Sequence, residues 1–319
     1  MLDLSRRDFV VSTGLAAALG LNARLVVPAF AQKTPDPTPG FVRYKVGSAE
    51  VTAIYDGIWE KPHDPAFIAN ASVDDVKNAM TKAGLPADFV SIPFTVIVVK
   101  NGGKTILCDS GTGGQVQPTA GRLMTNMKAA GIDPTKIDTI LISHFHPDHI
   151  FGLMEKETNK PVYPDVEIIV SDAEYKFWTD PAVIDRLPEA RKGLARRIQQ
   201  VFPTWKNMRQ VEGEPEVAPG IRFVSSPGHT PGHVVFVHKP AKVAFVGDVL
   251  FRGSIGRTDF PRGNHEQLLN SIRKRLWPLG DDITFVPGHG QTSTFGWERK
   301  TNSFVADLLF DDDEEEAQA

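Results

Sequence analysis

Hydrophobic residues fall into short β-branched runs along most of this chain, and such runs predict strands. Residues 94–99 and 105–108 lie on either side of Asn101-Gly102-Gly103, a pairing typical of a β-hairpin. The predicted strands are 51–55, 94–99, 105–108, 139–143, 166–170, 221–225, 234–237, 243–246 and 283–286.

Helical periodicity appears at fewer places. Ser72 is a predicted N-cap for a helix over 72–83, and Gly131 ends a helix over 123–130. An amphipathic helix is expected over 266–276, and an Arg- and Lys-rich helical insert over 172–205 is expected to hold two helices split near Pro181. Hairpins come first and strand–helix alternation comes later. This order predicts an α/β fold in which two sheets lie between helices.

The first 31 residues resemble a twin-arginine export signal. Arg6 and Arg7 precede an apolar stretch over 10–23, and Ala29-Phe30-Ala31 offers a signal-peptidase site. A bilayer span needs about 20 apolar residues, so we favour a cleaved signal over a membrane anchor, with no stable span afterwards. The resemblance implies the twin-arginine export machinery as a partner and a periplasmic or secreted location.

The remaining chain divides by composition. Residues 32–40 are a Pro-rich spacer, residues 41–310 form the expected catalytic domain, and residues 311–319 form an acidic tail that we expect to be disordered. The net charge is −4, and the six acidic residues at 311–316 account for more than all of it. A nearly neutral body argues against nucleic-acid binding. The single cysteine, Cys108, lies in a predicted strand and is expected to be buried.

Histidine and aspartate gather directly after predicted strands. The clearest case is the H-x-H-x-D-H motif over 144–149. A further histidine, an aspartate and a last histidine each follow a later strand in a loop with Gly or Pro. Imidazole and carboxylate are ligands that suit zinc and similar divalent ions. The candidate ligands are His144, His146, Asp148, His149, His229, Asp248 and His289.

This order of ligands resembles the metallo-β-lactamase superfamily across about 41–309. The resemblance implies a four-layer αββα sandwich with the helical insert at 172–205, and two divalent metal ions. Zinc is expected first, with manganese, iron or cobalt as alternatives. His144, His146 and His229 would hold one ion, Asp148, His149 and His289 the other, and Asp248 would bridge them. The resemblance also makes Asp109 a residue that orients the imidazoles.

Two metals close together can generate hydroxide at neutral pH, which would attack the substrate. Asp148 is both a candidate ligand and the candidate catalytic proton shuttle. The predicted function is therefore a dinuclear metal-dependent hydrolase of a small-molecule substrate. Two alternatives remain open, a mononuclear iron persulfide dioxygenase and a β-lactamase. The oligomeric state is left open.

Motifs bearing on the substrate point in two directions. Residues 254–261 and the segment after His289 resemble glyoxalase II-like thioesterases. The segment 109–114 and the insert resemble exported lactonases and organophosphate hydrolases, although Phe251 stands where such lactonases often carry a tyrosine. We therefore expect an ester-like bond: thioester, ester or lactone, with phosphotriester as a minor activity. The insert aromatics, which could either line a pocket or pack the helices, are Phe177, Trp178, Phe202 and Trp205.

Four further histidines are weaker candidates. His233 is balanced between orienting a ligand and a purely structural role. His238 and His265 are expected to be solvated, and His63 is expected to play no part in the site.

Overall fold

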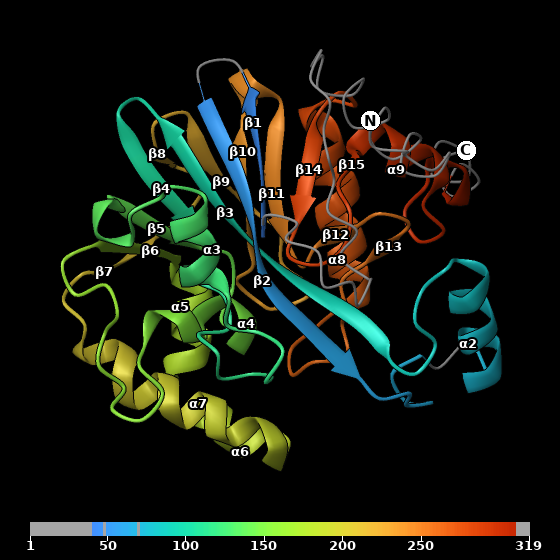
Figure 1. The fold of residues 1–319 in the computed structure, drawn as a ribbon, viewed down its shortest axis with the longest axis horizontal. Coiled ribbons are helices and arrows are strands. Elements are labelled where there is room, and N and C mark those ends of the chain that lie inside the picture. Colours follow the sequence, from blue (N-terminus) through green and yellow to red (C-terminus); the bar gives the residue numbers. More distant parts are fainter. Residues whose placement is uncertain (1–39, 47–48, 69–70, 311–319) are drawn as a thin grey trace, which may run out of the picture.

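Two mixed sheets face each other in the computed structural model, which describes residues 40–46, 49–68 and 71–310 (Figure 1). Within these residues, seven strands form the first sheet in chain order, and β4 to β7 are parallel neighbours. Its strands are β1 (Phe41–Val46), β2 (Ala49–Lys61), β3 (Val90–Asn101), β4 (Lys104–Cys108), β5 (Thr139–Ile142), β6 (Glu167–Ser171) and β7 (Met208–Val211).

The second sheet is built from the later part of the chain, in the order β15-β14-β11-β10-β9-β8. Its strands are β8 (Glu216–Ala218), β9 (Ile221–Ser225), β10 (Val234–His238), β11 (Val243–Gly247), β14 (Thr284–Pro287) and β15 (Ser293–Thr294). A two-stranded ribbon of β12 (Leu250–Phe251) and β13 (Ser254–Ile255) follows β11.

Helices cover the outer face of each sheet (Figure 1). Those beside the first sheet are α3 (Leu123–Ala129), α4 (Pro147–Ile150), α5 (Asp172–Thr179), α6 (Ala182–Arg186) and α7 (Glu189–Val201). Those beside the second are α8 (His265–Ser271), its π-helical continuation η5 (Ile272–Leu276) and α9 (Phe295–Thr301). α2 (Val73–Lys82) lies near the far end of the β2–β3 hairpin, and Ser72 caps it as predicted.

Short 3-10 turns complete the described chain. They are η1 (Pro134–Lys136), η2 (Phe151–Leu153), η3 (Phe202–Thr204), η4 (Lys239–Ala241), η6 (Trp277–Leu279) and η7 (Asp307–Leu309).

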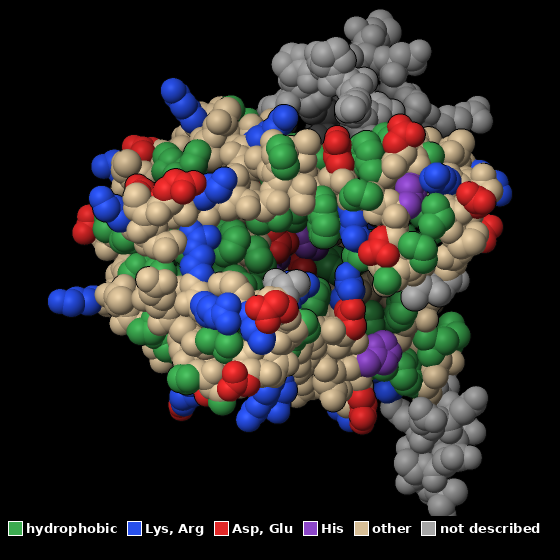
Figure 2. Space-filling model, turned by 90° about the horizontal axis from the view of Figure 1, so that it is seen from below, with side chains coloured by type: hydrophobic (Ala, Val, Ile, Leu, Met, Phe, Trp, Pro, Cys, Tyr) green, Lys and Arg blue, Asp and Glu red, His purple; other side chains and the backbone are tan. Residues whose placement is uncertain are grey.

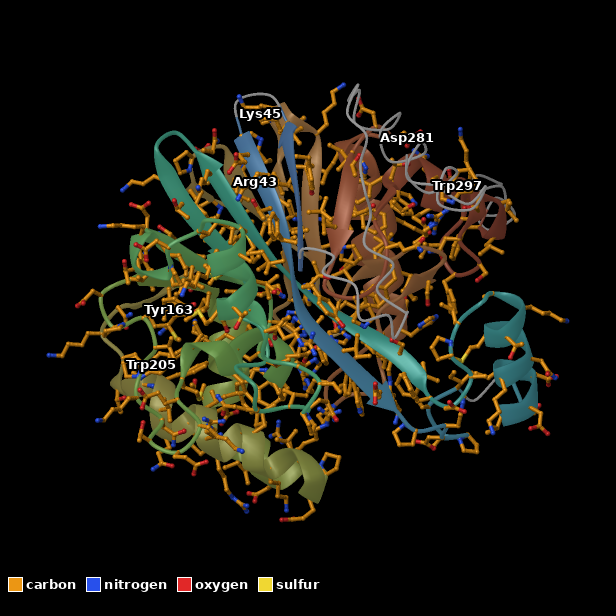
Figure 3. All side chains as sticks on the ribbon, viewed as in Figure 1. Arg43, Lys45, Tyr163, Trp205, Asp281 and Trp297 are labelled. Carbon is orange, nitrogen blue, oxygen red and sulfur yellow. The ribbon has the colours of Figure 1, made fainter. Side chains whose placement is uncertain are left out.

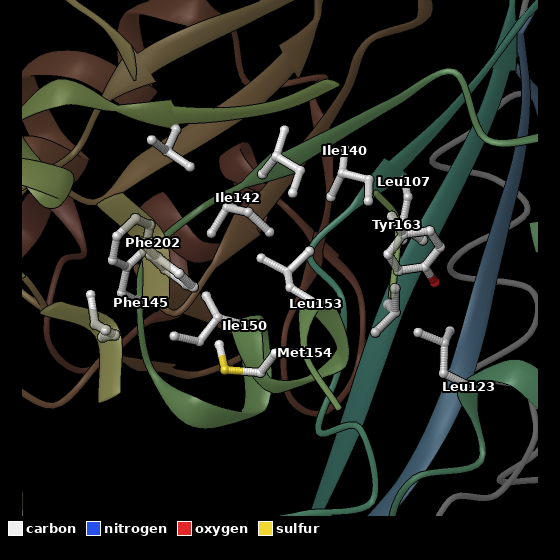
Figure 4. Packing of buried hydrophobic residues seen from close by; sticks show 14 of the residues in the cluster. Leu107, Leu123, Ile140, Ile142, Phe145, Ile150, Leu153, Met154, Tyr163 and Phe202 are labelled. Carbon is white, nitrogen blue, oxygen red and sulfur yellow. The ribbon is translucent and has the colours of Figure 1, made fainter. Parts of the chain in front are cut away.

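Three hydrophobic clusters fill the spaces between these layers. One lies between the sheets and contains Ile106, Leu141, Phe223 and Phe236. Another packs the first sheet against its helices, with Phe145 and Phe202 in ring contact at 5.1 Å (Figure 4). The last packs the second sheet against α8, η5 and α9. The order helix, sheet, sheet, helix confirms the predicted four-layer αββα sandwich.

The helical insert differs from the prediction in one respect. It contains three helices, because a second break at Pro188 follows the one near Pro181. Proline disfavours the helical conformation in the residue before it, and Leu187 is accordingly extended, with ψ 143°.

Most of the aromatic residues in the insert pack within the protein interior. Trp178 and Phe202 are buried, and Trp205 contacts Phe202 in a tilted arrangement with ring centres 5.1 Å apart. Trp205 lies among the helices beside the first sheet (Figure 3). Phe177 instead lines a cavity of about 450 Å³ beside Pro231 and Pro261.

Several predictions fall outside the described residues. The export signal, all but the last residue of the spacer, and the acidic tail belong to this group and remain predictions. Among the described helices, none combines the length and apolar character needed to cross a membrane. Cys108 is buried, as expected.

Candidate metal centre

The predicted ligands come from loops that follow strands of both sheets. His144 and His146 lie between β5 and α4, and α4 carries Asp148 and His149. His229 lies between β9 and β10. Asp248 and His289 come directly after β11 and after the end of β14. The close approach of these loops brings all seven residues into two adjacent groups.

The first group is a set of three buried imidazoles, His144, His146 and His229. The Nε2 atoms of His144 and His229 each lie 3.0 Å from Nδ1 of His146. A ring nitrogen carries either one proton or one lone pair, so the shared nitrogen of His146 cannot donate to both neighbours. Three lone pairs converging on one point is the arrangement that a divalent cation stabilises.

The second group combines Asp148, His149, Asp248 and His289. Nε2 of His289 lies 3.1 Å from Oδ2 of Asp248 and 3.3 Å from Oδ2 of Asp148. Oδ2 of Asp248 is also 3.6 Å from Nε2 of His229 in the first group. Asp248 is therefore the carboxylate placed between the two groups.

Backbone carbonyls orient two of the imidazoles. Nδ1 of His229 lies 2.7 Å from the carbonyl oxygen of Arg257, and Nδ1 of His289 lies 2.9 Å from that of Pro93. A carbonyl oxygen only accepts, so each Nδ1 carries a proton and each Nε2 is turned toward the cluster. This arrangement is the one that metal binding requires.

Two buried atoms of the second group lack a hydrogen-bond partner among the described residues, Nε2 of His149 and Oδ1 of Asp248. Buried polar atoms are normally paired, and these two face each other at 3.5 Å across the group. Together with the donor chemistry of both groups, they fit a site for two divalent cations.

Burial and neighbouring charges shift the pKa values of the two groups in different ways. Burial, with help from neighbouring imidazoles, lowers the pKa of His144 and His146 well below the usual range, so both are neutral and free to ligate. Burial opposes ionisation of Asp148, but His149 and His289 outweigh it and lower its pKa to about 2. His144 and His146 of the first group are therefore neutral, whereas Asp148 of the second group is ionised.

Comparison with known proteins agrees with this geometry. The family model described as the metallo-beta-lactamase superfamily matches residues 93–289. This chain belongs to the metallo-β-lactamase superfamily. The matched residues include all seven candidate ligands, and the structure brings these residues together in two clusters.

The superfamily relatives include hydrolases of several names. The chain is 41% identical to the hydroxyacylglutathione hydrolase GloC of Haemophilus influenzae over 173 residues, 53% of this chain and 76% of that protein. AidC, a dizinc quorum-quenching lactonase, superposes with a TM-score of 0.69 at 22% identity, covering 81% of this chain and 94% of AidC. The hydrolase AbOPH gives a TM-score of 0.67 at 24% identity over 80% and 91% of the two chains. The two structural similarities concern the fold.

Asp109 lies beside the imidazole of His149, a candidate ligand, as the resemblance to this superfamily implied. Its carboxylate accepts from the Ser143 amide at 2.7 Å and the Ser143 hydroxyl at 2.8 Å, and its Oδ2 lies 2.7 Å from Nδ1 of His149. Asp109 itself has a φ of 62°, a left-handed conformation that costs energy outside glycine and often marks functional sites. These bonds orient the His149 imidazole toward the second group.

Replacing Asp109 with asparagine should therefore weaken metal binding by roughly 10- to 100-fold, the usual cost of losing such an orienting partner. Asparagine keeps the size of the side chain but removes the charge that faces His149. Metal retained after dialysis against a graded chelator would measure the change. The matched control is Asp165→Asn on an exposed loop, and equal retention in both variants would contradict the assignment.

Glu174 is a buried residue that sequence reasoning missed. One oxygen accepts from the Phe145 amide at 3.0 Å and from the Trp178 indole at 2.9 Å. The other accepts from the Thr230 hydroxyl at 2.8 Å and the Gly232 amide at 2.9 Å. One carboxylate at the start of α5 thus joins the loop of His144 and His146 to the loop of His229.

His233 orients Asp248 without belonging to either group of ligands. Its Nε2 accepts from the Asp248 amide at 3.1 Å, and its ring stacks on His144 with centres 4.7 Å apart. Gly247 lies so close that an added Cβ would be 2.7 Å from that Nε2. Of the two roles that the sequence left open for His233, the structure therefore supports the orienting one.

The other histidines have no place in the site. His265 is exposed, as expected. The expectation that His238 is solvated is wrong, since it is buried, accepts from the Ala241 amide at 3.1 Å and contacts Asn101. His63 instead bonds to the carbonyl of Ala87. A structural histidine at the end of a buried strand is hard to distinguish by sequence from an exposed one.

The site opens at the base of a hollow (Figure 2). Histidine and acidic side chains are visible on its floor, and Lys or Arg side chains flank its rim. Phe260 contacts two of the candidate ligands, with its ring centre 4.6 Å from that of His146 and 5.2 Å from that of His229. Phe251 contacts His289 from another side, at 5.9 Å.

Proposed function

We propose that this protein is a dinuclear metal-dependent hydrolase that cleaves an ester-like bond, with thioesters favoured over esters and lactones, and phosphotriesters as minor substrates. The observation that carries the proposal is the position of Asp248, whose one carboxylate lies beside imidazoles of both ligand groups. Such a carboxylate suits two cations that act as a pair.

The site residues have two roles, cation binding and proton transfer. His144, His146 and His229 would hold one cation, and Asp148, His149 and His289 the other, with Asp248 shared. When bound, two divalent cations polarise the scissile bond and lower the pKa of water to near neutrality.

Asp148 is well placed to move a proton. It is partly accessible, unlike His149, and its Oδ2 lies 3.3 Å from Nε2 of His289. A carboxylate that is both within the site and open to the substrate side can take a proton from the attacking water and return it to the leaving group. We assign that transfer to Asp148.

Zinc is the first choice of cation. The imidazole and carboxylate donors suit zinc, and AidC, which shares the fold, is named a dizinc enzyme. Manganese, iron and cobalt accept the same donors, so cation supply would decide between them.

Thioester cleavage is supported by the similarity to GloC, a hydroxyacylglutathione hydrolase. A lactonase is less well supported, because Phe251 beside His289 offers no hydroxyl where lactonases often carry tyrosine. A hydrophobic ring there can position a substrate chain but cannot donate to an oxyanion.

The test is a cation count on the full chain together with a substrate panel. We expect about two zinc or manganese ions per chain, and hydrolysis of a simple thioester that a chelator abolishes and added metal restores. The panel contains one thioester, one aryl ester, one lactone and one aryl phosphotriester at equal concentration. A single iron per chain, with oxygen consumed when a persulfide is added and no hydrolysis, would overturn the proposal in favour of a dioxygenase.

A further inference from the structure

A pair of guanidinium groups lies over the aromatic ring that borders the metal ligands. The Arg191 guanidinium carbon, from α7, lies 4.6 Å from the centre of the Phe260 ring, and that of Arg257 lies 5.2 Å from it. The same ring contacts His146 and His229. The Phe260 ring therefore lies between these two guanidinium groups and the candidate ligands of the first group.

The two arginines differ in what already binds them. Arg257 forms a two-point ion pair with Asp259, with 2.9 Å between Nε and Oδ1, and its carbonyl accepts from His229. Its charge is thus compensated and its position fixed.

Arg191 has no such partner. In the part of the chain that the structure describes, no carboxylate lies within ion-pair distance of the Arg191 guanidinium, which lies over the face of Phe260. The residue is only partly exposed. A half-buried guanidinium with five donors and no acceptor favours an incoming anion.

The charges facing Arg191 agree with this view. Burial and the neighbouring Arg257 lower the pKa of the Arg191 guanidinium, while Asp148 and Asp259 oppose that shift. Asp259 is occupied by Arg257, and Asp148 belongs to the ligand group. Neither carboxylate is free to neutralise Arg191, so a net attraction for an anion remains beside Phe260.

We infer that Arg191 is a specificity-determining residue that binds a carboxylate on the substrate, so that the preferred substrate is an anionic thioester or ester. The inference rests on the proposed hydrolase function. The planar guanidinium would hold the carboxylate by two parallel hydrogen bonds, with Phe260 below it setting the distance to the scissile bond. A neutral substrate of the same shape would lose this contact.

The experiment compares substrates that differ only in charge. One pair is S-acetyl-3-mercaptopropionate and its amide, with the charge on the thiol side. The other is S-ethyl monothioglutarate and its terminal amide, with the charge on the acyl side. Rates are corrected for spontaneous hydrolysis. We expect the full-length metal-loaded protein to favour the acid of at least one pair by roughly 10- to 100-fold in kcat/KM, the range for a charge-assisted pair.

Arg191→Gln should remove that preference by raising KM for the acids, because the lost contact binds the substrate equally in the ground state and the transition state. The rate of amide hydrolysis should stay within about twofold of the wild-type rate. Arg191→Lys should restore part of it, since the charge remains but the fork does not. The matched control is Arg196→Gln, an exposed arginine on the same helix, which should change nothing.

The outcomes separate the two proposals. If neither acids nor amides are hydrolysed, the proposed function fails, and calorimetric binding of 3-(ethylthio)propionate to the wild type and to Arg191→Gln still tests the anion site. Equal rates for acids and amides, unchanged by Arg191→Gln, overturn the inference and leave the hydrolase intact. Equal loss with acids and amides in Arg191→Gln also overturns it, because that result marks a structural role.

Discussion

Asp248→Ala is expected to lower kcat/KM for the thioester by at least about a thousandfold, which corresponds to about 4 kcal/mol of transition-state stabilisation. The carboxylate lies 3.1 Å from His289 and 3.6 Å from His229, so one substitution removes a contact to both ligand groups. The three imidazoles of the first group remain, and we expect that group still to bind a cation. The cation count should therefore fall to about one per chain.

The measurement combines elemental analysis with steady-state kinetics on the same preparation. Asp165→Ala, at an exposed carboxylate outside the candidate site, is the matched control and should retain both cations. Circular dichroism and thermal unfolding would show that the variant is folded. A variant that keeps two cations and loses less than tenfold in rate would show that Asp248 does not join the two groups.

Glu174→Ala is expected to destabilise the fold by more than about 4 kcal/mol, because it leaves four buried donors without their acceptor at about 1–3 kcal/mol each. The donors are those of Phe145, Trp178, Thr230 and Gly232. Gly232 packs so tightly that an added Cβ would lie 2.0 Å from the Glu174 amide nitrogen. This packing leaves little room for water to replace the carboxylate on that side.

Glu174→Gln separates lost hydrogen bonding from lost volume. The amide keeps the shape, but its NH₂ group faces donors where an oxygen accepted, so we expect most of the loss to remain. Chemical denaturation would give the free energy of unfolding, and chelator competition would give metal affinity, which should fall because both ligand loops lose their common anchor. Glu157→Ala, at an exposed glutamate, is the control. A loss below about 1 kcal/mol in both Glu174 variants would show that the anchor is dispensable.

The seven candidate ligands could be predicted from sequence because they lie in short segments that follow hydrophobic strands. The sheet holds the strand ends in place, so the approximate position of a motif that follows a strand, such as H-x-H-x-D-H, can be inferred from sequence. The superfamily pattern then supplied the pairing of distant segments. The hairpin of β3 and β4 was equally accessible, since Asn101-Gly102-Gly103 is a local turn signal.

The role of Glu174 could not be predicted in this way. Its partners lie 29 residues before it and 58 residues after it, and nothing local distinguishes it from an exposed glutamate on an amphipathic helix. The same holds for Arg191, which belongs to an Arg-rich helix and is distinguished only by Phe260 from a distant loop. The third helix of the insert was missed because Pro188 was not weighed as a second break.

The sequence by itself determined the fold class, the seven candidate ligands and their order along the chain, because hydrophobic periodicity and strand-end motifs are local properties. Only the tertiary structure decided that Asp248 lies between both ligand groups and that Glu174 joins their loops. It also decided that Arg191 lies over Phe260 with no ion-pair partner among the described residues. These features depend on contacts between residues far apart in the chain, and such contacts exist only once the two sheets have packed against each other.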